Sequence, residues 1–457
     1  MDRTRTTRIT RIFADNFQNR TTVLPAAFIS RTQMLLGDEW EAFEQALQEA
    51  PPVSIRLNPA KRLPFSLEHN EKVPWASHAF YLNSRPSFTL DPLFHAGCYY
   101  VQEASSMFLE QIVRKHVSKP IKALDLCAAP GGKSTHLISI LPEGSLLVAN
   151  EAVRSRAYIL AENLVKWGNP RAIVTQNDPS AFEPIDRFFD LIVADLPCSG
   201  EGLFRKDPES IREWSVEQVR FCAERQKRIV ADSWKALKPG GLFVYSTCTY
   251  NREENEDNIA WIGRNLGAEP AEAIHRFFPH QTKGEGFFIT ALRKNNDNER
   301  NKGNRRNEKR KDPPGRRIPQ ELKKSLAHPE CFDIFPENNA FIAIPSALAE
   351  DYLFLKNRLK IISAGIRLGE TKGRDTIPAQ ALAMSTFLAR SSFPILELSR
   401  EASLKYLRKE TLSDLPADFP KGYALAAYLQ QPLGFIKNIG TRANNLYPQE
   451  WRIRMSV

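Results

Sequence analysis

Residues 121–134 read IKALDLCAAPGGKS and contain the first clear sign of a strand followed by a helix. The first six residues form a short apolar run with one aspartate, and the alanines, proline and glycines after them indicate a tight turn. A helical pattern begins at Lys133. Gly131 and Gly132 lack Cβ atoms, so the backbone can turn sharply and a ligand can come close to it. We therefore predict a strand, a turn and a helix whose first N–H groups face a ligand.

Three kinds of ligand come into question for this turn. A phosphate-binding P-loop requires a glycine at the position of Cys127. A dinucleotide fingerprint requires G-x-G-x-x-G, but only two adjacent glycines are present. A pocket for the methionine end of S-adenosylmethionine (SAM) tolerates both departures. The turn alone does not distinguish among these three ligands. The sequence after the turn distinguishes them.

The following residues alternate between strand and helix patterns, which is typical of a doubly wound parallel sheet. Strands are predicted at 123–126, 146–150, 172–175, 191–194 and 242–245, with a final strand at 286–293. Helices are predicted at about 134–141, 154–167, 216–237 and 253–266. Lys238-Pro-Gly-Gly241 is interpreted as the stop of the third helix before the fifth strand. Residues 99–293 are thus expected to form a Rossmann-like α/β domain.

The residues before this domain predict a small α+β domain at 1–98. Residues up to about 22 resemble a flexible lead, and residues 24–47 have helical periodicity. Residues 53–59, VSIRLNP, alternate as a strand with Arg56 on one face, while residues 75–90 suggest irregular strands. Residues 99–116 indicate a helix entered from a strand. This domain could be a packing lid or an RNA-contacting arm, and the residues alone do not separate the two.

Charge and length indicate further parts of the chain. The 457 residues suffice for two or three domains, and the formal net charge of +10 favours an anionic partner. Residues 293–317 hold eleven Lys or Arg and four Asp or Glu, so 11 − 4 = +7 of this charge is local. We interpret residues 294–317 as a basic flexible linker that can touch a phosphate backbone without folding.

Residues 318–457 predict a C-terminal α+β domain of mixed short elements. Near its end basic and aromatic residues interleave, as at Phe435, Lys437, Tyr447, Trp451 and Arg452. Such a mixture suits a nucleic-acid surface, because cations neutralise phosphates and rings stack on bases. A β-rich accessory domain without this role stays open.

Six scattered cysteines without a C-x-x-C pair favour a reducing compartment and argue against a disulfide framework or a zinc site. His95 and Cys98 have ligand-like spacing but no second pair, so we predict no metal. No apolar segment follows the N-terminal arginines as in a signal peptide, and no run approaches the ~20 residues of a membrane helix. We expect a cytoplasmic protein that is a monomer and does not contact a membrane.

Ligand groups in a doubly wound fold gather at the carboxyl ends of the strands. Carboxylates follow each of the first four predicted strands: Asp125, Glu151, Asp178 and Asp195. Glu151 fits an acid that binds two ribose hydroxyls, unless it only caps a helix. Asp178 could accept from an adenine amino group, although an ordinary turn aspartate before Pro179 explains it as well.

Two cysteines, Cys198 in DLPCSG and Cys248 in STCTY, follow the fourth and fifth strands. A cysteine beside strands is usually a small buried hydrophobe, but two at ligand-facing ends are harder to explain that way. Methyl transfer to a pyrimidine C5 needs a thiolate at C6, because addition there makes C5 nucleophilic. Asp195 suits an acid near N3. The Asn/Asp-Pro-Pro-aromatic turn of amino-methylating enzymes is missing here, which disfavours that chemistry.

Several blocks of this sequence resemble the Sun-type RNA cytosine-C5 methyltransferases, and most closely their bacterial small-subunit rRNA branch. The core blocks are CAAPGGK (127–133), DLPCSGEGLFRKDP (195–208) and YSTCTYNREENE (245–256). Outer blocks are LPAAFISRTQMLLGDEWEAF (24–43), SIRLNP (54–59), LFHAGCYYVQEASSM (93–107) and NNLYPQEWRI (444–453). The resemblance covers nearly the whole chain except its first residues and the basic linker.

The resemblance implies specific roles. Cys248 corresponds to the family's nucleophile, and Cys198 to the cysteine that assists product release. The SAM contacts correspond to Cys127, Ala128, Ala129, Pro130, Gly131, Gly132, Lys133, Glu151, Asp178 and Asp195. DNA cytosine methyltransferases instead use the Pro-Cys thiol with a Glu-Asn-Val motif, which we do not find. The C-terminal domain is implied to be similar to PUA RNA-binding modules.

We therefore predict a SAM-dependent enzyme that makes 5-methylcytidine in rRNA through a covalent Cys248 adduct on a flipped or unpaired cytosine. The expected partner is 16S rRNA or the small ribosomal subunit. A tRNA substrate stays open, because the core motifs are shared between the two branches. A non-catalytic ribosome-assembly factor with a vestigial SAM pocket is the third possibility, although both thiols and the full loop are present.

Overall fold

The computed structural model describes residues 23–64, 66–67, 70–296, 318–373, 375–412 and 415–455. The predicted flexible lead and most of the predicted basic linker lie outside these residues.

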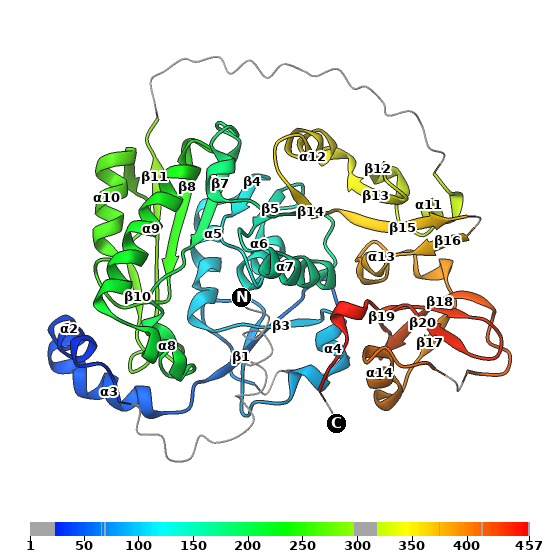
Figure 1. Cartoon of the computed structure of the whole chain (residues 1–457), viewed down its shortest axis with the longest axis horizontal. Helices are drawn as coiled ribbons and strands as arrows, with labels where there is room; N and C mark the ends of the chain where they lie inside the picture. Colours follow the sequence, from blue (N-terminus) through cyan, green and yellow to red (C-terminus); the bar gives the residue numbers. More distant parts are fainter. Residues whose placement is uncertain are drawn as a thin grey trace.

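The five predicted core strands run parallel through the centre of the molecule (Figure 1). They are β4 (Lys122–Asp125), β5 (Leu146–Asn150), β6 (Ala172–Thr175), β7 (Phe189–Asp195) and β8 (Leu237–Thr247). Their spatial order is β6-β5-β4-β7-β8. The order reverses direction beside β4, and ligands of doubly wound sheets bind at such a switch point. The predicted Rossmann-like core is therefore confirmed.

Antiparallel strands extend this sheet at both edges. β11 (Phe287–Lys294) pairs with β8, and β9 (Ala268–Pro270) and β10 (His275–Phe277) pair with β11. At the other edge β14 (Ile361–Ala364) pairs with β6.

Helices cover both faces of the sheet because every core strand is apolar on both sides. Val148 belongs to the same apolar cluster as Ile229 of α9 (Val216–Trp234) and Ile262 of α10 (Glu256–Leu266). The neighbouring residues of β5 pack on the opposite face, against α5 (Leu109–His116), α6 (Gly132–Ile140) and α7 (Arg154–Trp167). Such continuous apolar runs are expected of parallel strands buried on both faces.

The segment Lys238-Pro-Gly-Gly241 does not act as the predicted helix stop. Helix α9 ends at Trp234, and β8 already begins at Leu237. Leu237 pairs with Phe189 and Leu242 with Leu191, so Lys238 to Gly241 bulge out of the ladder. Gly240 has φ +71°, a conformation that glycine adopts without strain. The Pro-Gly-Gly sequence therefore marks a bulge in β8 and not the end of α9.

The N-terminal residues form helices and a small antiparallel sheet. The predicted helix at 24–47 is two helices, α2 (Ala26–Leu36) and α3 (Trp40–Gln48), because Gly37 takes φ +56° between them. The sheet has the order β2 (Ala79–Leu82), β1 (Val53–Leu57), β3 (Tyr99–Val101). After β3 the chain passes through a 3-10 turn before α5, so the predicted helix of 99–116 is shorter than expected.

The C-terminal residues are distributed over two further sheets and the core. One sheet has the order β12 (Phe332–Glu337), β13 (Ala340–Pro345), β15 (Ile366–Lys372), β16 (Asp375–Pro378). The other has the order β17 (Ile395–Glu397), β18 (Gly422–Tyr428), β19 (Gln431–Asn438), β20 (Ala443–Asn445). Further helices of the chain are α8 (Pro208–Glu213), α11 (Gln320–Lys324), α12 (Ala349–Lys356) and α13 (Gln380–Met384). Because β14 belongs to the core sheet, residues 318–457 differ from the single separate domain that we predicted.

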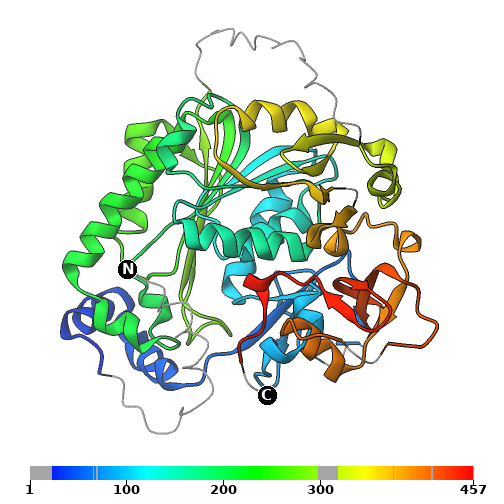
Figure 2. The same ribbon diagram turned by 45° about the vertical axis from the view of Figure 1, so that its right-hand side comes forward.

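The N-terminal sheet packs against both the core and the last sheet. Ile55 of β1 and Leu93 of α4 (Pro92–His95) share one apolar cluster with Leu396 and with Leu404 of α14 (Arg400–Leu407). Figure 2 shows α4 and α14 side by side at the lower edge of the molecule. This packing joins the N-terminal sheet to the last sheet, and the Asn58 side chain joins it to the core through the Trp167 carbonyl.

Candidate active site

The turn between β4 and α6 lies beside a pocket of about 200 Å³. Gly131 has φ +114° and Gly132 opens the helix. A Cβ atom at Gly132 would lie 3.3 Å from the ring of Tyr100, so a side chain there would crowd the pocket. The pocket is lined by Tyr100, Val101, Gln102, Glu103, Ser106, Cys127, Ala128, Ala129, Pro130, Gly132, Lys133 and Asp195.

The sequence-predicted cofactor residues are thus partly brought together. The turn residues except Gly131 line the pocket together with Lys133 and Asp195, whereas Glu151 and Asp178 lie outside its lining. The wall from Tyr100 to Ser106 was not among the predicted site residues. It consists of the end of β3 and the residues after it, within the resembling block at 93–107, and that resemblance was the only signal that could have pointed to it.

Glu151 and Asp178 both make local contacts. Glu151 is 5% exposed; its Oε1 accepts from the Val153 N–H at 2.9 Å, and its Oε2 lies 3.5 Å from Arg156 Nη1. Asp178 caps the 3-10 turn Pro179–Phe182 through a 3.1 Å bond from the Ser180 N–H. Asp178 therefore has the structural role of a turn aspartate before Pro179, which the sequence left open beside an adenine contact.

Asp125 lies at the end of β4 and is fully buried. Its Oδ2 accepts from Ser134 Oγ at 2.6 Å, while its Oδ1 has no hydrogen-bond partner among the described residues. Burial raises the pKa of Asp125 to about 7. This carboxyl group therefore titrates near neutral pH behind the pocket.

We expect Asp125→Asn to remove a pH dependence of stability. With a pKa of about 7 when folded and 3.8 ordinarily, the folded protein keeps a proton that the unfolded chain loses. The wild-type free energy of unfolding should therefore fall as the pH rises, by roughly 2 to 3 kcal/mol between pH 5 and 8 relative to the variant. Urea unfolding of both proteins at four pH values measures this. Parallel curves would contradict the prediction.

Asp195 and Lys133 form an ion pair at the edge of the pocket. Lys133 Nζ lies 2.8 Å from Asp195 Oδ2, and Ser246 Oγ donates to Asp195 Oδ1 at 2.8 Å. Although burial opposes the charged form, Asp195 raises the pKa of Lys133, and Cys248 adds to this electrostatically. A cation is thus fixed between the pocket and Cys248.

The two predicted catalytic cysteines touch each other. Cys198 Sγ lies 3.2 Å from Cys248 Sγ, since the adjacent parallel strands β7 and β8 end side by side. The contact with Cys248, followed by burial, raises the pKa of the Cys198 thiol well above its ordinary value. Cys198 therefore keeps its proton and can donate an S–H hydrogen bond to Cys248.

Two buried carboxylates hold the loops that carry the thiols. Glu254 Oε2 accepts from the Ser199 N–H at 3.0 Å and from Gln226 Nε2 at 2.8 Å. Glu201 Oε2 accepts from the N–H groups of Tyr250 and Asn251 at 2.8 and 2.9 Å. Glu254 thus receives a bond from the residue after Cys198, and Glu201 receives bonds from the second and third residues after Cys248, roles that the sequence did not predict.

Two further features of the described part of the chain concern membranes and metal ions. None of its helices is long and apolar enough to cross a membrane. No group of three or more His, Cys, Asp or Glu side chains there could hold a metal ion. His95 Nε2 instead lies 2.9 Å from the Thr89 carbonyl, and Cys98 is fully buried.

Three parts of the chain match known protein families. Residues 118–293 match the 16S rRNA methyltransferase RsmB/F family, and residues 24–104 match the N-terminal domain of 16S rRNA methyltransferase RsmF. Residues 393–453 match the methyltransferase RsmF PUA domain. The last match covers the sheet of β17 to β20.

Relatives are similar over most of their length. Ribosomal RNA small subunit methyltransferase F of Shewanella amazonensis is 30% identical over 412 residues, which are 83% of this chain and 85% of that protein. The protein of the same name from Erwinia tasmaniensis is 29% identical over 469 residues, which are 93% and 96%.

Solved structures share the fold. A methyltransferase homolog protein from Pyrococcus horikoshii is 28% identical with a TM-score of 0.51, covering 59% of this chain and 94% of that one. NSun6 from the same organism, solved with SFG, has a TM-score of 0.52 at 20% identity, covering 61% of this chain and the whole of that one.

A doubly wound sheet with a ligand pocket at its switch point and a PUA domain defines a SAM-dependent RNA methyltransferase. The chain belongs to the family of the ribosomal RNA small subunit methyltransferases F. The family resemblance stated from the sequence is confirmed.

Proposed function

We propose that this enzyme methylates C5 of a cytosine in 16S rRNA and uses Cys248 as a covalent nucleophile. The observation that carries the proposal is the 3.2 Å contact between the sulfur atoms of Cys198 and Cys248. These thiols lie at the strand ends next to Asp195, which itself lines the pocket. C5 methylation needs one thiol that adds to the ring and a second group that helps to remove a proton.

The groups that surround the two sulfur atoms favour Cys248 as the nucleophile. Cys198 keeps its proton and can stabilise a neighbouring thiolate through its S–H group. The Lys133 ammonium interacts electrostatically with Cys248 from the other side. Cys248 Sγ therefore has both a hydrogen-bond donor and a cation in its surroundings, as is typical of reactive cysteines.

The reaction then proceeds through a covalent adduct on Cys248. Its thiolate adds to C6 and the bond electrons move toward C5 and N3, where the Asp195–Lys133 pair supplies the polar contact and a proton. SAM bound in the pocket would supply the methyl group for C5 and leave as S-adenosylhomocysteine. Return of the N3 proton to the Asp195–Lys133 pair, loss of the C5 proton and breakage of the Sγ–C6 bond would then restore the pyrimidine and the Cys248 thiolate.

Cys198 is suited to the final step because its acidity depends on Cys248. The largest cause of its raised pKa is the contact with the Cys248 sulfur. Once Cys248 is bonded to C6, its sulfur no longer accepts the S–H bond of Cys198, and Cys198 can pass its proton to water. The Cys198 thiolate can then accept the C5 proton while the Sγ–C6 bond breaks and Cys248 leaves as a thiolate.

The predicted cofactor residues have distinct roles in this proposal. The turn from Cys127 to Lys133 holds the methionine end of SAM at the first N–H groups of α6. Glu151 accepts from the ribose hydroxyls, and Asp178 from the adenine amino group. The buried position of Glu151 beside the end of β5 supports its role.

The relatives support an rRNA substrate. Their names specify the ribosomal RNA of the small subunit, and the PUA match at 393–453 supports RNA contact by the last sheet. We propose that 16S rRNA or the small ribosomal subunit is the partner, and that the enzyme acts as a monomer in the cytoplasm.

Release of tritium from RNA labelled at cytosine C5 tests the proposed chemistry. A C5 methyl transfer must displace this hydrogen, so we expect one tritium released for each methyl group incorporated from SAM. Methyl incorporation without tritium release would place the methyl group on another atom and overturn the proposal.

A further inference from the structure

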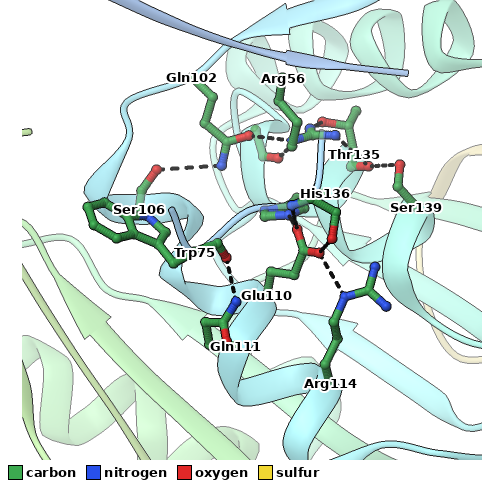
Figure 3. Close-up of polar contacts among 12 residues, drawn as sticks. Arg56, Trp75, Gln102, Ser106, Glu110, Gln111, Arg114, Thr135, His136 and Ser139 are labelled. Atoms are coloured by element: carbon green, nitrogen blue, oxygen red, sulfur yellow. Dashed lines mark hydrogen bonds and ion pairs between the residues drawn. The ribbon is translucent and has the colours of Figure 1, made fainter. Parts of the chain in front are cut away.

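Arg56 of the N-terminal strand β1 is buried, and its guanidinium group lies between Gln102 and Thr135 (Figure 3). Arg56 is 2% exposed, and its guanidinium carbon lies 4.6 Å from the centre of the Trp167 ring. Its hydrogen bonds go to uncharged oxygen atoms of Gln102, Gly132 and Thr135. A buried charge is costly, and here hydrogen bonds to neutral groups offset the cost without a paired carboxylate among these bonds. The question is what this buried guanidinium does in the protein.

The bonds of Arg56 reach two walls of the pocket. Nε donates to Gln102 Oε1 at 2.8 Å, and Gln102 lines the pocket. Nη2 donates to the Gly132 carbonyl at 3.2 Å and to Thr135 Oγ1 at 2.6 Å, both in the first turn of α6. Thr135 Oγ1 in turn donates to the Gly131 carbonyl at 2.8 Å. One planar guanidinium thus connects the glycine turn with the facing side chain.

Two physical effects of Arg56 act on the pocket. Its fixed donors hold the first turn of α6, whose free N–H groups point at a ligand, in one geometry. Its positive charge adds to the positive end of the helix, which favours an anionic ligand group such as a carboxylate. A lysine cannot replace it, because a single ammonium group does not span both walls as the guanidinium fork does.

We propose that Arg56 is a positioning residue for SAM binding, through which the N-terminal sheet sets the geometry of the cofactor pocket. The inference rests on the assignment of this pocket to SAM under the proposed function. Arg56 does not line the pocket itself and acts through Gly132, Thr135 and Gln102.

Asn58 provides a matched control. It is also 2% exposed and follows Arg56 by two residues. Its Nδ2 donates to the carbonyls of Gly97 and Trp167, both at 2.9 Å, and so joins the N-terminal sheet to the core without touching the glycine turn. Loss of Asn58 weakens the same interface but leaves the pocket walls in place.

The test measures the dissociation constant for SAM by calorimetry, together with the melting temperature, for the full-length protein. We expect Arg56→Met and the milder Arg56→Lys to raise this constant about tenfold or more, and Asn58→Ala to change it less than about twofold at a similar loss of melting temperature. Deuterium uptake of residues 131–137 should rise in both Arg56 variants and stay unchanged in Asn58→Ala.

A further variant separates the inference from the pocket assignment on which it rests. Gly132→Val places a side chain against Tyr100 and should weaken SAM binding if the pocket is assigned correctly. Weak binding by Gly132→Val with wild-type binding by both Arg56 variants would overturn the role of Arg56 alone. Unchanged binding by Gly132→Val would overturn the pocket assignment itself.

Discussion

Replacing Cys248 by alanine should abolish methyl transfer to RNA while SAM still binds. The substitution removes the only thiol that the proposal uses for addition to C6, so we expect turnover to fall by a factor of about 10³ or more. The pocket residues stay in place because Cys248 is not among those that line it. SAM affinity should therefore remain within about twofold of the wild type. Methyl incorporation and calorimetry measure the two quantities.

Cys222→Ala is the control for this variant. Cys222 is a buried cysteine on α9, and the proposal gives it no part in the reaction. It should retain activity close to that of the wild type. Substantial turnover by Cys248→Ala would remove Cys248 from the role of nucleophile.

Cys198→Ala should accumulate a covalent complex of enzyme and RNA. Addition of Cys248 and transfer of the methyl group do not require Cys198, but removal of the C5 proton does. The methylated adduct should thus persist, and a shifted band should appear on a denaturing gel when RNA and SAM are both supplied. We expect most of the enzyme in this band and less than a few per cent for the wild type.

The double variant Cys198→Ala/Cys248→Ala identifies the atom that carries the adduct. It should show no shifted band, because the sulfur that bonds to C6 is missing. Methylation by Cys198→Ala at the wild-type rate, without a shifted band, would contradict the role of Cys198 in product release.

The sequence predicts the core of this structure well because its signals are local. The apolar run at 121–126 followed by two glycines determines β4 and the turn before α6. The strand order of a doubly wound sheet then places Cys198 and Cys248 at neighbouring strand ends, as observed. These positions depend on periodicity and topology, which can be inferred without knowing tertiary contacts.

Other features depend on contacts that periodicity does not encode. The pocket wall around Gln102 comes from an irregular segment after β3, and Arg56 reaches it from a different sheet. Similarly, the short apolar run of β14 gives no sign that its partner is β6. Glu254 is separated from Ser199 by 55 residues, and only the folded chain shows that it holds the Cys198 loop.

Bisulfite sequencing of rRNA and tRNA, from cells with and without this gene, tests the proposed function most directly. Methylation at C5 protects a cytosine from conversion, so we expect a single 16S rRNA cytosine to lose its protection when the gene is absent. Complementation with the wild-type gene should restore protection, and the Cys248→Ala gene should not. Loss of protection in tRNA alone would contradict the proposal that 16S rRNA is the substrate. No loss in either RNA would contradict the proposal that the enzyme methylates cytosine C5.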